Sequence, residues 1–186
     1  NYTIMFKFDI GRESINDYNL YRRRRAKESL VYLTNFIRIN EKKILDIGCG
    51  HGSNAYTLAI GGANVTAMDI DEERLEVAKK INHHPNITYT KNPIEQFINE
   101  QFQIVTILDV LEHIENYEKL IKNVTSIINK DSFIYIEYNP YFSFIGHHLY
   151  DYTLLPVQLF PYEITKKIVL NKAKKGGIFS ADKSLK

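Results

Sequence analysis

The chain has 186 residues, of which 44% are hydrophobic and 25% charged, a mixture that predicts one folded globular domain and excludes a disordered chain. The formal net charge is +2, which gives no support to a dedicated nucleic-acid binder, since such proteins carry a strongly basic face. The positive charge gathers at one end, because residues 163–186 hold seven lysines against two acidic residues.

Helices and strands are predicted to alternate along most of the chain. Short apolar runs that end in glycine or polar residues predict buried strands, and apolar positions three or four residues apart predict helices. In chain order we expect a helix over 17–38, a strand over 42–47, a helix near 54–59, a strand over 65–69, a helix from an acidic start at 71–73 to 81, strands over 87–89 and 104–108, a helix over 117–128 and a strand over 133–137. This alternation predicts an α/β fold, a Rossmann-like three-layer sandwich in which helices cover both faces of a mostly parallel sheet.

The last part of the chain departs from this pattern. Residues 138–162 hold eight Tyr or Phe residues and three prolines without a clear period, which indicates an irregular aromatic insertion. Residues 164–175 then predict a basic helix. We therefore expect a single domain with three parts: an N-terminal helical cap over 1–40, a core over 41–137, and an aromatic insertion or lid with a basic tail over 138–186.

A glycine-rich loop follows the first predicted strand. The sequence from Asp46 to Gly52 is Asp-Ile-Gly-Cys-Gly-His-Gly, and a helix is predicted directly after it. Glycines at such a turn let the backbone bend sharply and leave no Cβ in the path of a ligand. Asp69 stands nineteen residues beyond Gly50, at the end of the second strand, where a carboxylate can accept hydrogen bonds from ribose hydroxyls. The combination predicts a nucleotide-like ligand at this loop.

The positions of the glycines separate two classes of nucleotide-binding domain. A dinucleotide fingerprint, G-x-G-x-x-G, counted from Gly48 and Gly50, requires its third glycine at the position that Ser53 occupies. The third glycine is Gly52 instead, and Asp46 adds a negative charge just before the loop. That charge disfavours a pyrophosphate and favours a ligand that carries an ammonium and a sulfonium group.

These residues resemble the first motif of the class I S-adenosylmethionine-dependent methyltransferases, an acid followed by G-x-G-x-G. The resemblance covers roughly residues 18–140: Val65–Asp71 is similar to the second-strand motif of that family, and Leu108–Ile114 to the fourth-strand motif of many small-molecule members. It implies the strand order 3-2-1-4-5 and S-adenosyl-L-methionine as the cofactor. The family usually adds two closing strands, which we do not identify in the sequence.

The resemblance also implies which residues bind the cofactor. They are Asp46, Gly48, Cys49, Gly50, Gly52, Asp69, Ile70, Asn92, Ile94, Leu108 and Asp109. The family commonly has an acid after the third strand that contacts the adenine amino group; this chain has none there, so Asn92 or the backbone near Ile94 is expected to replace it. Asp71 is interpreted as a helix cap, and Cys49 as a small packing residue rather than a reactive thiol.

His113 is the candidate catalytic base, because it follows the fourth strand at the edge of the sheet where ligands of open α/β folds bind. Methyl transfer from a sulfonium is an in-line displacement, for which much of the acceleration comes from holding the acceptor in line. A general base is needed only where the nucleophile must lose a proton, as a hydroxyl does. The alternative is that Glu112 and His113 only order the start of the next helix.

A metal site at the same place is a further alternative. Asp109, Glu112 and His113 stand at i, i+3 and i+4, which can place them on one face of a helical turn. With His147 or His148 from the insertion they could form a divalent site of oxygen and nitrogen ligands, as in some quinone- and RNA-end-modifying methyltransferases. Many relatives with the same Glu-His pair bind no metal, and we predict none here.

The methyl acceptor is expected to be a small molecule with an aromatic or lipid-like body, methylated on oxygen or nitrogen, which the aromatic insertion could enclose. Arg22–Arg25 spread around a helix and form no stripe, so we interpret them as a solvated or partly stacked face and predict no nucleic-acid partner. The alternative function is a non-catalytic cofactor-binding partner subunit of a methyltransferase complex, paired through the aromatic insertion. A homodimer is left open.

The cysteine content bears on location. The single cysteine, Cys49, excludes an internal disulfide and suits a reducing compartment, so a cytoplasmic location is expected. No run approaches the roughly 18 apolar residues of a membrane span, and stable membrane insertion is not expected. The first residue is Asn1 rather than a methionine, so the natural start is expected to lie upstream.

Overall fold

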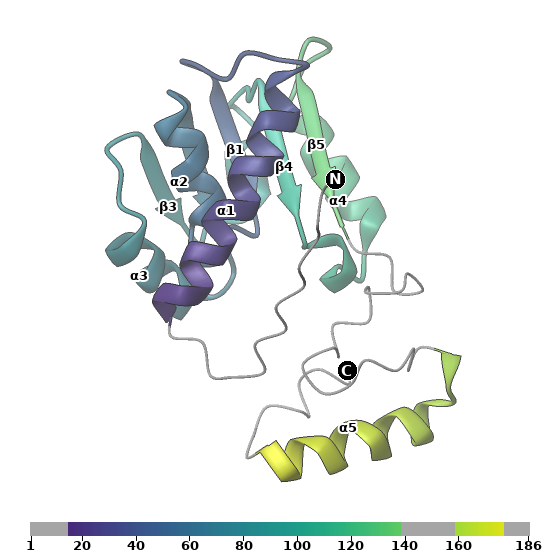
Figure 1. Ribbon diagram of the computed structural model, residues 1–186. Helices are drawn as coiled ribbons and strands as arrows, with labels where there is room; N and C mark the ends of the chain where they lie inside the picture. Colours follow the sequence, from purple (N-terminus) through teal and green to yellow (C-terminus); the bar gives the residue numbers. More distant parts are fainter. Residues whose placement is uncertain (1–14, 139–158, 177–186) are drawn as a thin grey trace. The chain divides into compact units, whose positions relative to one another are not determined.

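A computed structural model describes residues 15–138 and 159–176 of the chain (Figure 1). The chain divides into two compact units, one of Arg12–Glu137 and one of Asn1–Gly11 with Tyr138–Lys186. The first contains the sheet, and we call it the core unit. Its elements are α1 (Ile15–Thr34), β1 (Lys43–Ile47), α2 (Ser53–Ile60), β2 (Asn64–Met68), α3 (Glu72–Ile81), β3 (Ile87–Thr90), the 3₁₀ turn η1 (Ile94–Phe97), β4 (Ile104–Leu108), the 3₁₀ turn η2 (Leu111–His113), α4 (Tyr117–Ser126) and β5 (Phe133–Glu137).

The core unit is built on one parallel sheet of five strands with the order β3-β2-β1-β4-β5. The central strands β1 and β4 are almost entirely buried, as apolar strands covered on both faces must be. This arrangement confirms the predicted Rossmann-like class and strand order. The order reverses between β1 and β4, so their carboxyl ends border the crevice in which sheets of this kind bind ligands.

Two apolar cores cover the two faces of the sheet. On one face, Leu33 of α1 and Leu58 of α2 are buried together with Ile44 of β1, and we call this the first core. On the other face, η1, α4 and the segment before β4 form the second core, in which Phe102 packs with Leu45. Ile44 and Leu45 belong to different cores because side chains alternate along a strand. Figure 1 shows α1 and α2 in front of the sheet and α4 behind it, which confirms helices on both faces.

Predicted and observed helix ends differ where an apolar residue leaves a helix for a core. α1 ends at Thr34, four residues before the predicted end at 38, and Ile37, which follows the helix, packs against the first core. α4 ends at Ser126, because Ile127 is buried in the second core and its carbonyl accepts a hydrogen bond from the N–H of Phe102 (2.9 Å). The predicted strands over 104–108 and 133–137 match β4 and β5 at both ends.

The end of the chain is described in part. α5 (Tyr162–Gly176) confirms the predicted basic helix, and within it the Lys166 ammonium lies 5.7 Å from the centre of the Tyr162 ring. Most of the predicted aromatic insertion, residues 139–158, lies outside the described residues. The three-part division of the chain therefore stays a prediction. None of the helices in the described ranges is long and apolar enough to cross a membrane.

Candidate functional site

The glycine-rich loop joins β1 to α2 at the carboxyl edge of the sheet. Gly48, Gly50 and Gly52 have φ angles of 69°, 53° and 79°, in the left-handed region that favours glycine. A Cβ on Gly48 would lie 2.3 Å from Cγ2 of Val110, and one on Gly52 would lie 2.4 Å from the hydroxyl oxygen of Tyr89. A Cβ on Gly50 would meet no atom of the described residues within 4 Å. Packing thus requires two of the glycines, whereas Gly50 faces open space that a ligand can enter.

Hydrogen bonds fix this loop to the end of β2. The N–H of Gly48 donates to the carbonyl of Met68 (2.8 Å). The N–H of Gly50 donates to Oδ2 of Asp69 (2.7 Å), and the other carboxylate oxygen of Asp69 accepts from the N–H of Asp71 (2.9 Å). Asp69 therefore shapes the loop, a role that sequence reasoning missed. Each carboxylate oxygen has further acceptor capacity for a ligand hydroxyl.

Asp46 is a buried carboxylate with one unpaired oxygen. The residue is 2% exposed, and its Oδ1 accepts hydrogen bonds from Nδ2 of Asn54 and Oγ1 of Thr106, both at 2.7 Å. Within the described part of the chain, its Oδ2 has no hydrogen-bond partner. Burial raises the pKa of Asp46 to about 6, against the lowering effect of the two bonds. A buried acceptor without a partner costs free energy, and a cationic ligand at the loop would provide the partner.

Sequence reasoning missed both residues that hold Asp46. Thr106 lies opposite Asp46 in the register of β1 with β4. It is a buried hydroxyl in the middle of an otherwise apolar strand, Ile-Val-Thr-Ile-Leu, and that contrast is a signal by which it could have been found. Asn54 gave no comparable signal, because a polar residue in the first turn of a helix is common.

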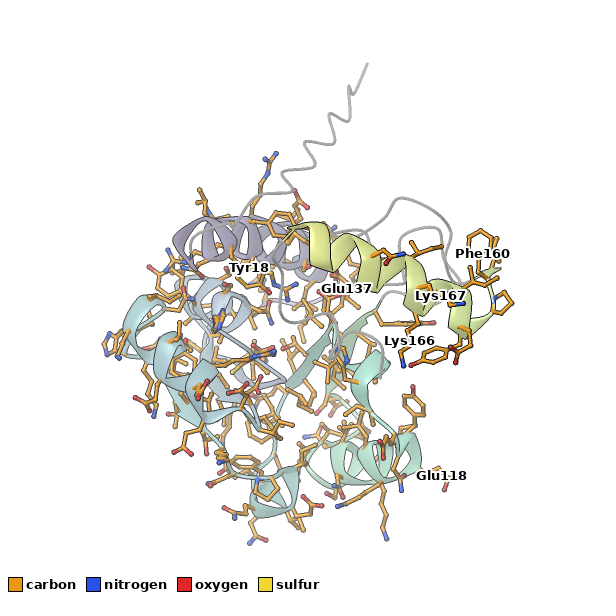
Figure 2. The ribbon with its side chains drawn as sticks, turned by 90° about the horizontal axis from the view of Figure 1, so that it is seen from below. Tyr18, Glu118, Glu137, Phe160, Lys166 and Lys167 are labelled. Carbon is orange, nitrogen blue, oxygen red and sulfur yellow. The ribbon has the colours of Figure 1, made fainter. Side chains whose placement is uncertain are left out.

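Two arginines of α1 pair with acids at the carboxyl ends of β4 and β5. Nη1 of Arg22 lies 2.7 Å from Oδ2 of Asp109, and Nη1 of Arg25 lies 3.5 Å from the same oxygen. Arg25 also pairs with Glu137, which lies next to α1 in Figure 2 and accepts a hydrogen bond from Oγ of Ser29 (2.8 Å). These contacts tie α1 to the edge of the sheet that carries the glycine-rich loop.

A third arginine, Arg23, faces α2 and α3. Its Nε donates to Oδ1 of Asn82 (2.7 Å), its Nη2 donates to the carbonyl of Ile81 (2.8 Å), and its guanidinium carbon lies 4.1 Å from the centre of the Tyr56 ring. Arg24 points to solvent, with 84% of its side chain exposed. The expected solvated or partly stacked face fits Arg24, which is solvated, and Arg23, which stacks on Tyr56. The hydrogen bonds and ion pairs of Arg22, Arg23 and Arg25 were not expected. Their partners lie 58 to 112 residues away in the chain, so a single sequence does not reveal them.

The arginine run provides a matched pair of substitutions for stability. Arg23→Ala removes two charged hydrogen bonds and leaves a buried amide oxygen without its donor, so we expect a loss of about 1.5–2.5 kcal/mol in the free energy of unfolding. Arg24→Ala, one residue away, is expected to change it by less than about 0.5 kcal/mol. Urea denaturation of both variants measures the difference, and equal stabilities would contradict the inward orientation of Arg23.

The remaining predicted site residues reach the same edge of the sheet from three strands. They are Ile70 after β2, Asn92 and Ile94 after β3, and Leu108 and Asp109 at the end of β4. The side chain of Ile70 is exposed, whereas that of Ile94 is buried in the second core, so only the backbone of Ile94 is available to a ligand. The structure thus gathers the predicted residues along one edge. Their contacts with a cofactor stay a prediction.

His113 ends η2, and its side chain is exposed. Asp109 precedes that turn with a φ of 53° and pairs with Arg22, so Asp109 and His113 do not share one face of an α-helical turn. That premise of the metal alternative is wrong. No group of three His, Cys, Asp or Glu side chains among the described residues could hold a metal ion. His147 and His148, the other ligands considered, lie outside those residues.

The structure agrees with the packing and capping roles expected for two residues. Cys49 is partly buried against the first core. Burial, together with the carboxylates of Asp46 and Asp69, raises the pKa of its thiol far above the ordinary value, so it is not a reactive thiolate. Asp71 caps α3, because its carboxylate accepts a hydrogen bond from the N–H of Arg74 (3.2 Å).

Known proteins are similar in sequence to this region. Residues 45–136 match a family model described as a methyltransferase domain. The ubiquinone biosynthesis O-methyltransferase of Glaesserella parasuis is 35% identical over 104 residues, which cover 51% of this chain and 44% of that protein. The protein of the same name from Coxiella burnetii is 36% identical over 105 residues, which cover 53% and 44%. The chain spans about half the length of the curated relatives it matches.

Solved structures share the fold. A structure from Listeria monocytogenes assigned to the S-adenosylmethionine-dependent methyltransferases matches with a TM-score of 0.50 at 26% identity. The match covers 61% of this chain and 56% of the Listeria chain. Magnesium protoporphyrin IX methyltransferase from Synechocystis has a TM-score of 0.51 at 23% identity, with 64% and 61% covered, and supports the fold alone. The domain match, the strand order and the acid–glycine loop together place this chain in the class I S-adenosylmethionine-dependent methyltransferase family.

Proposed function

We propose that this chain binds S-adenosyl-L-methionine at the glycine-rich loop and transfers its methyl group to an oxygen atom of a small molecule. The observation that carries the proposal is the buried, unpaired Oδ2 of Asp46 beside a loop whose Gly50 faces open space. A negative oxygen at this place suits the ammonium group of the cofactor and repels a phosphate. The relatives named as O-methyltransferases favour oxygen over nitrogen as the methylated atom.

The other proposed cofactor contacts involve residues at the carboxyl edge of the sheet. Asp69 is proposed to accept hydrogen bonds from the ribose hydroxyls with the lone pairs that the loop leaves unused. The exposed apolar side chain of Ile70 is next to it and offers a surface for the adenine ring. Asn92 and the backbone of Ile94 are proposed to bind the adenine amino group. Leu108 and Asp109, at the end of β4, complete the site beside the loop.

The chemistry requires little of the protein beyond alignment and a base. When bound, the cofactor supplies an activated methyl group whose bond to sulfur breaks as the bond to the acceptor oxygen forms. The chain holds the acceptor in line with that bond and excludes water. His113 is proposed to take the proton of the acceptor hydroxyl, since its exposed side chain follows β4 at the ligand edge of the sheet.

The acceptor is proposed to have an aromatic or lipid-like body, which is consistent with relatives named for ubiquinone biosynthesis. We also propose a cytoplasmic location, supported by the single cysteine, Cys49, which suits a reducing compartment. Nucleic acid is not proposed as a partner, because three of the four arginines of the basic run are engaged within the core unit. Light scattering after size exclusion tests whether the protein forms the homodimer that the sequence leaves open.

A labelled-methyl experiment tests the proposed function. The protein is incubated with methyl-labelled S-adenosylmethionine and a cell extract, which is then separated into small-molecule, lipid, nucleic-acid and protein fractions. Label is expected in the small-molecule or lipid fraction. Label mainly in nucleic acid or protein would contradict the acceptor class. Cofactor binding without transfer to any fraction would favour the alternative of a non-catalytic partner subunit.

Asp69 and its neighbour Asp71 separate ligand binding from helix capping. Asp69→Ala is expected to weaken the binding of S-adenosylhomocysteine by about 1.5–3 kcal/mol, since it removes the charged acceptor of hydrogen bonds from the ribose hydroxyls and from the N–H of Gly50. Asp71→Ala removes the cap of α3, so about 1 kcal/mol of stability should be lost with little change in affinity. Calorimetric titration and thermal melting measure both. Unchanged affinity in Asp69→Ala would remove Asp69 from the site.

A further inference from the structure

Asn82 is a fully buried residue, directly after α3, whose side-chain amide is hydrogen-bonded at both ends. Its exposed fraction is 0%. Its Oδ1 accepts from Nε of Arg23 (2.7 Å), and its Nδ2 donates to Oδ1 of Asn19 (2.8 Å) and to the carbonyl of His51 (2.7 Å). Its own carbonyl accepts from the hydroxyl of Tyr89 (2.8 Å). One buried residue thus connects α1 and the glycine-rich loop through its side-chain amide, and β3 through its backbone carbonyl.

The bond to His51 fixes one peptide unit in the middle of the loop. That unit consists of the carbonyl of His51 and the N–H of Gly52. Asn82 binds the carbonyl, and the N–H donates to the carbonyl of Cys49 (2.8 Å). Glycine backbones have many accessible conformations, and Gly50 and Gly52 flank His51 on both sides. With both polar groups of the unit bound, the peptide plane cannot rotate without breaking one of these two hydrogen bonds.

The same network reaches α1 and the start of α2. Oδ1 of Asn19, on α1, accepts from Asn82 and also from Oγ of Ser53 (2.7 Å), the first residue of α2. The ring of Tyr18, also on α1, meets the His51 ring edge-on, with 5.7 Å between the ring centres. The loop is therefore held by Asp69 through Gly50 and, independently, by Asn82 through His51.

We propose that Asn82 is a positioning residue that holds the glycine-rich loop in its cofactor-binding conformation before the cofactor arrives, acting through the carbonyl of His51. The inference rests on the proposed cofactor site. A loop ordered in advance loses less conformational freedom when the cofactor binds, so the affinity for the cofactor is higher. Asn82 is fully buried, so its effect on this affinity is exerted through the loop. Loss of the bond should therefore free the loop and lower cofactor affinity together.

Two substitutions that remove different hydrogen bonds of Asn82 distinguish a role in positioning the loop from a general role in stability. Asn82→Asp keeps the size of the side chain and the acceptor for Arg23, but it replaces two N–H donors by an oxygen that faces two acceptor oxygens. Tyr89→Phe removes another hydrogen bond of Asn82 and leaves the His51 contact in place. Should Asn82→Asp fail to fold, Asn82→Ser removes both donors and leaves room for a water molecule.

The test combines calorimetry with hydrogen exchange at a temperature at which circular dichroism shows every variant folded. We expect Asn82→Asp to raise the Kd of S-adenosylhomocysteine by about ten-fold or more, and Tyr89→Phe by less than about two-fold. Amide exchange over residues 48–53 of the free protein should quicken in Asn82→Asp alone. Equal affinity and equal exchange in the two variants would overturn the inference. If the unaltered protein does not bind S-adenosylhomocysteine, the proposed function fails, and the exchange comparison still decides the role of Asn82.

Discussion

Asp46→Asn is expected to weaken the binding of S-adenosylhomocysteine by about 2–3 kcal/mol, or roughly 30- to 150-fold, because it removes the charge from the unpaired buried oxygen. The asparagine oxygen can still accept from Asn54 and Thr106, so the local structure should persist. In the unaltered protein, affinity should rise with pH through the range around 6 as Asp46 ionises to meet the ligand ammonium. Calorimetry over that range should show no such rise in Asp46→Asn.

Asp46→Asn, which is expected to lose affinity, is not expected to lose stability near neutral pH. The pKa of Asp46 is raised from 3.8 to about 6 in the folded protein, so between these values the folded state binds more protons than the unfolded state. The free energy of unfolding therefore falls as pH rises through this window, by about 2–3 kcal/mol at 1.4 kcal/mol per pKa unit. Asp46→Asn has no such titration and should be as stable as the unaltered protein, or more stable, near neutral pH. A large loss of stability there, as measured by urea denaturation, would show that Asp46 stabilises the fold.

Gly48→Ala is expected to lower the free energy of unfolding by about 3–4 kcal/mol. The added Cβ would lie 2.3 Å from a methyl group of Val110, a stiff β-branched side chain, and the φ of 69° is strained for any residue with a Cβ. Overpacking costs about 1–3 kcal/mol and left-handed backbone about 1–2 kcal/mol. Thermal and urea denaturation measure the sum.

Gly50→Ala is the matched control for that substitution. Gly50 has a similar φ of 53°, but its Cβ would meet no atom of the described residues within 4 Å, so only the backbone cost of about 1–2 kcal/mol applies. The main effect of Gly50→Ala should be a lower affinity for the cofactor, because the added methyl group would lie where the ligand approaches. Equal stability losses in the two variants would contradict the packing of Gly48 against Val110.

The sheet and the loop could be predicted because their signals are local. The apolar runs that became β1 and β4, and the glycines between Asp46 and Ser53, are contiguous in the sequence, and the spacing to Asp69 follows from one strand–helix–strand unit. Two helix ends were predicted too late, because Ile37 and Ile127 lie beyond the observed helices and pack against cores formed by distant segments.

The contacts that fix the site could not be predicted in this way. Arg25 meets Glu137 across 112 residues and Arg23 meets Asn82 across 59, and no local pattern marks either pair. A run of arginines around a helix predicts a solvated or partly stacked face, because exposed charge is the usual state of such residues. Asn82 stands at a helix end, where asparagine is ordinary, so its buried role emerges only from the folded chain.

Parallel calorimetric titrations with S-adenosylhomocysteine and with NAD test the central claim most directly, that the acid–glycine loop binds an adenosyl ligand with an ammonium group rather than a pyrophosphate. Asp46 and the third glycine at Gly52 predict saturable binding of S-adenosylhomocysteine with a Kd in the micromolar range, about −8 kcal/mol, and no detectable binding of NAD. Micromolar binding of NAD without binding of S-adenosylhomocysteine would contradict the account.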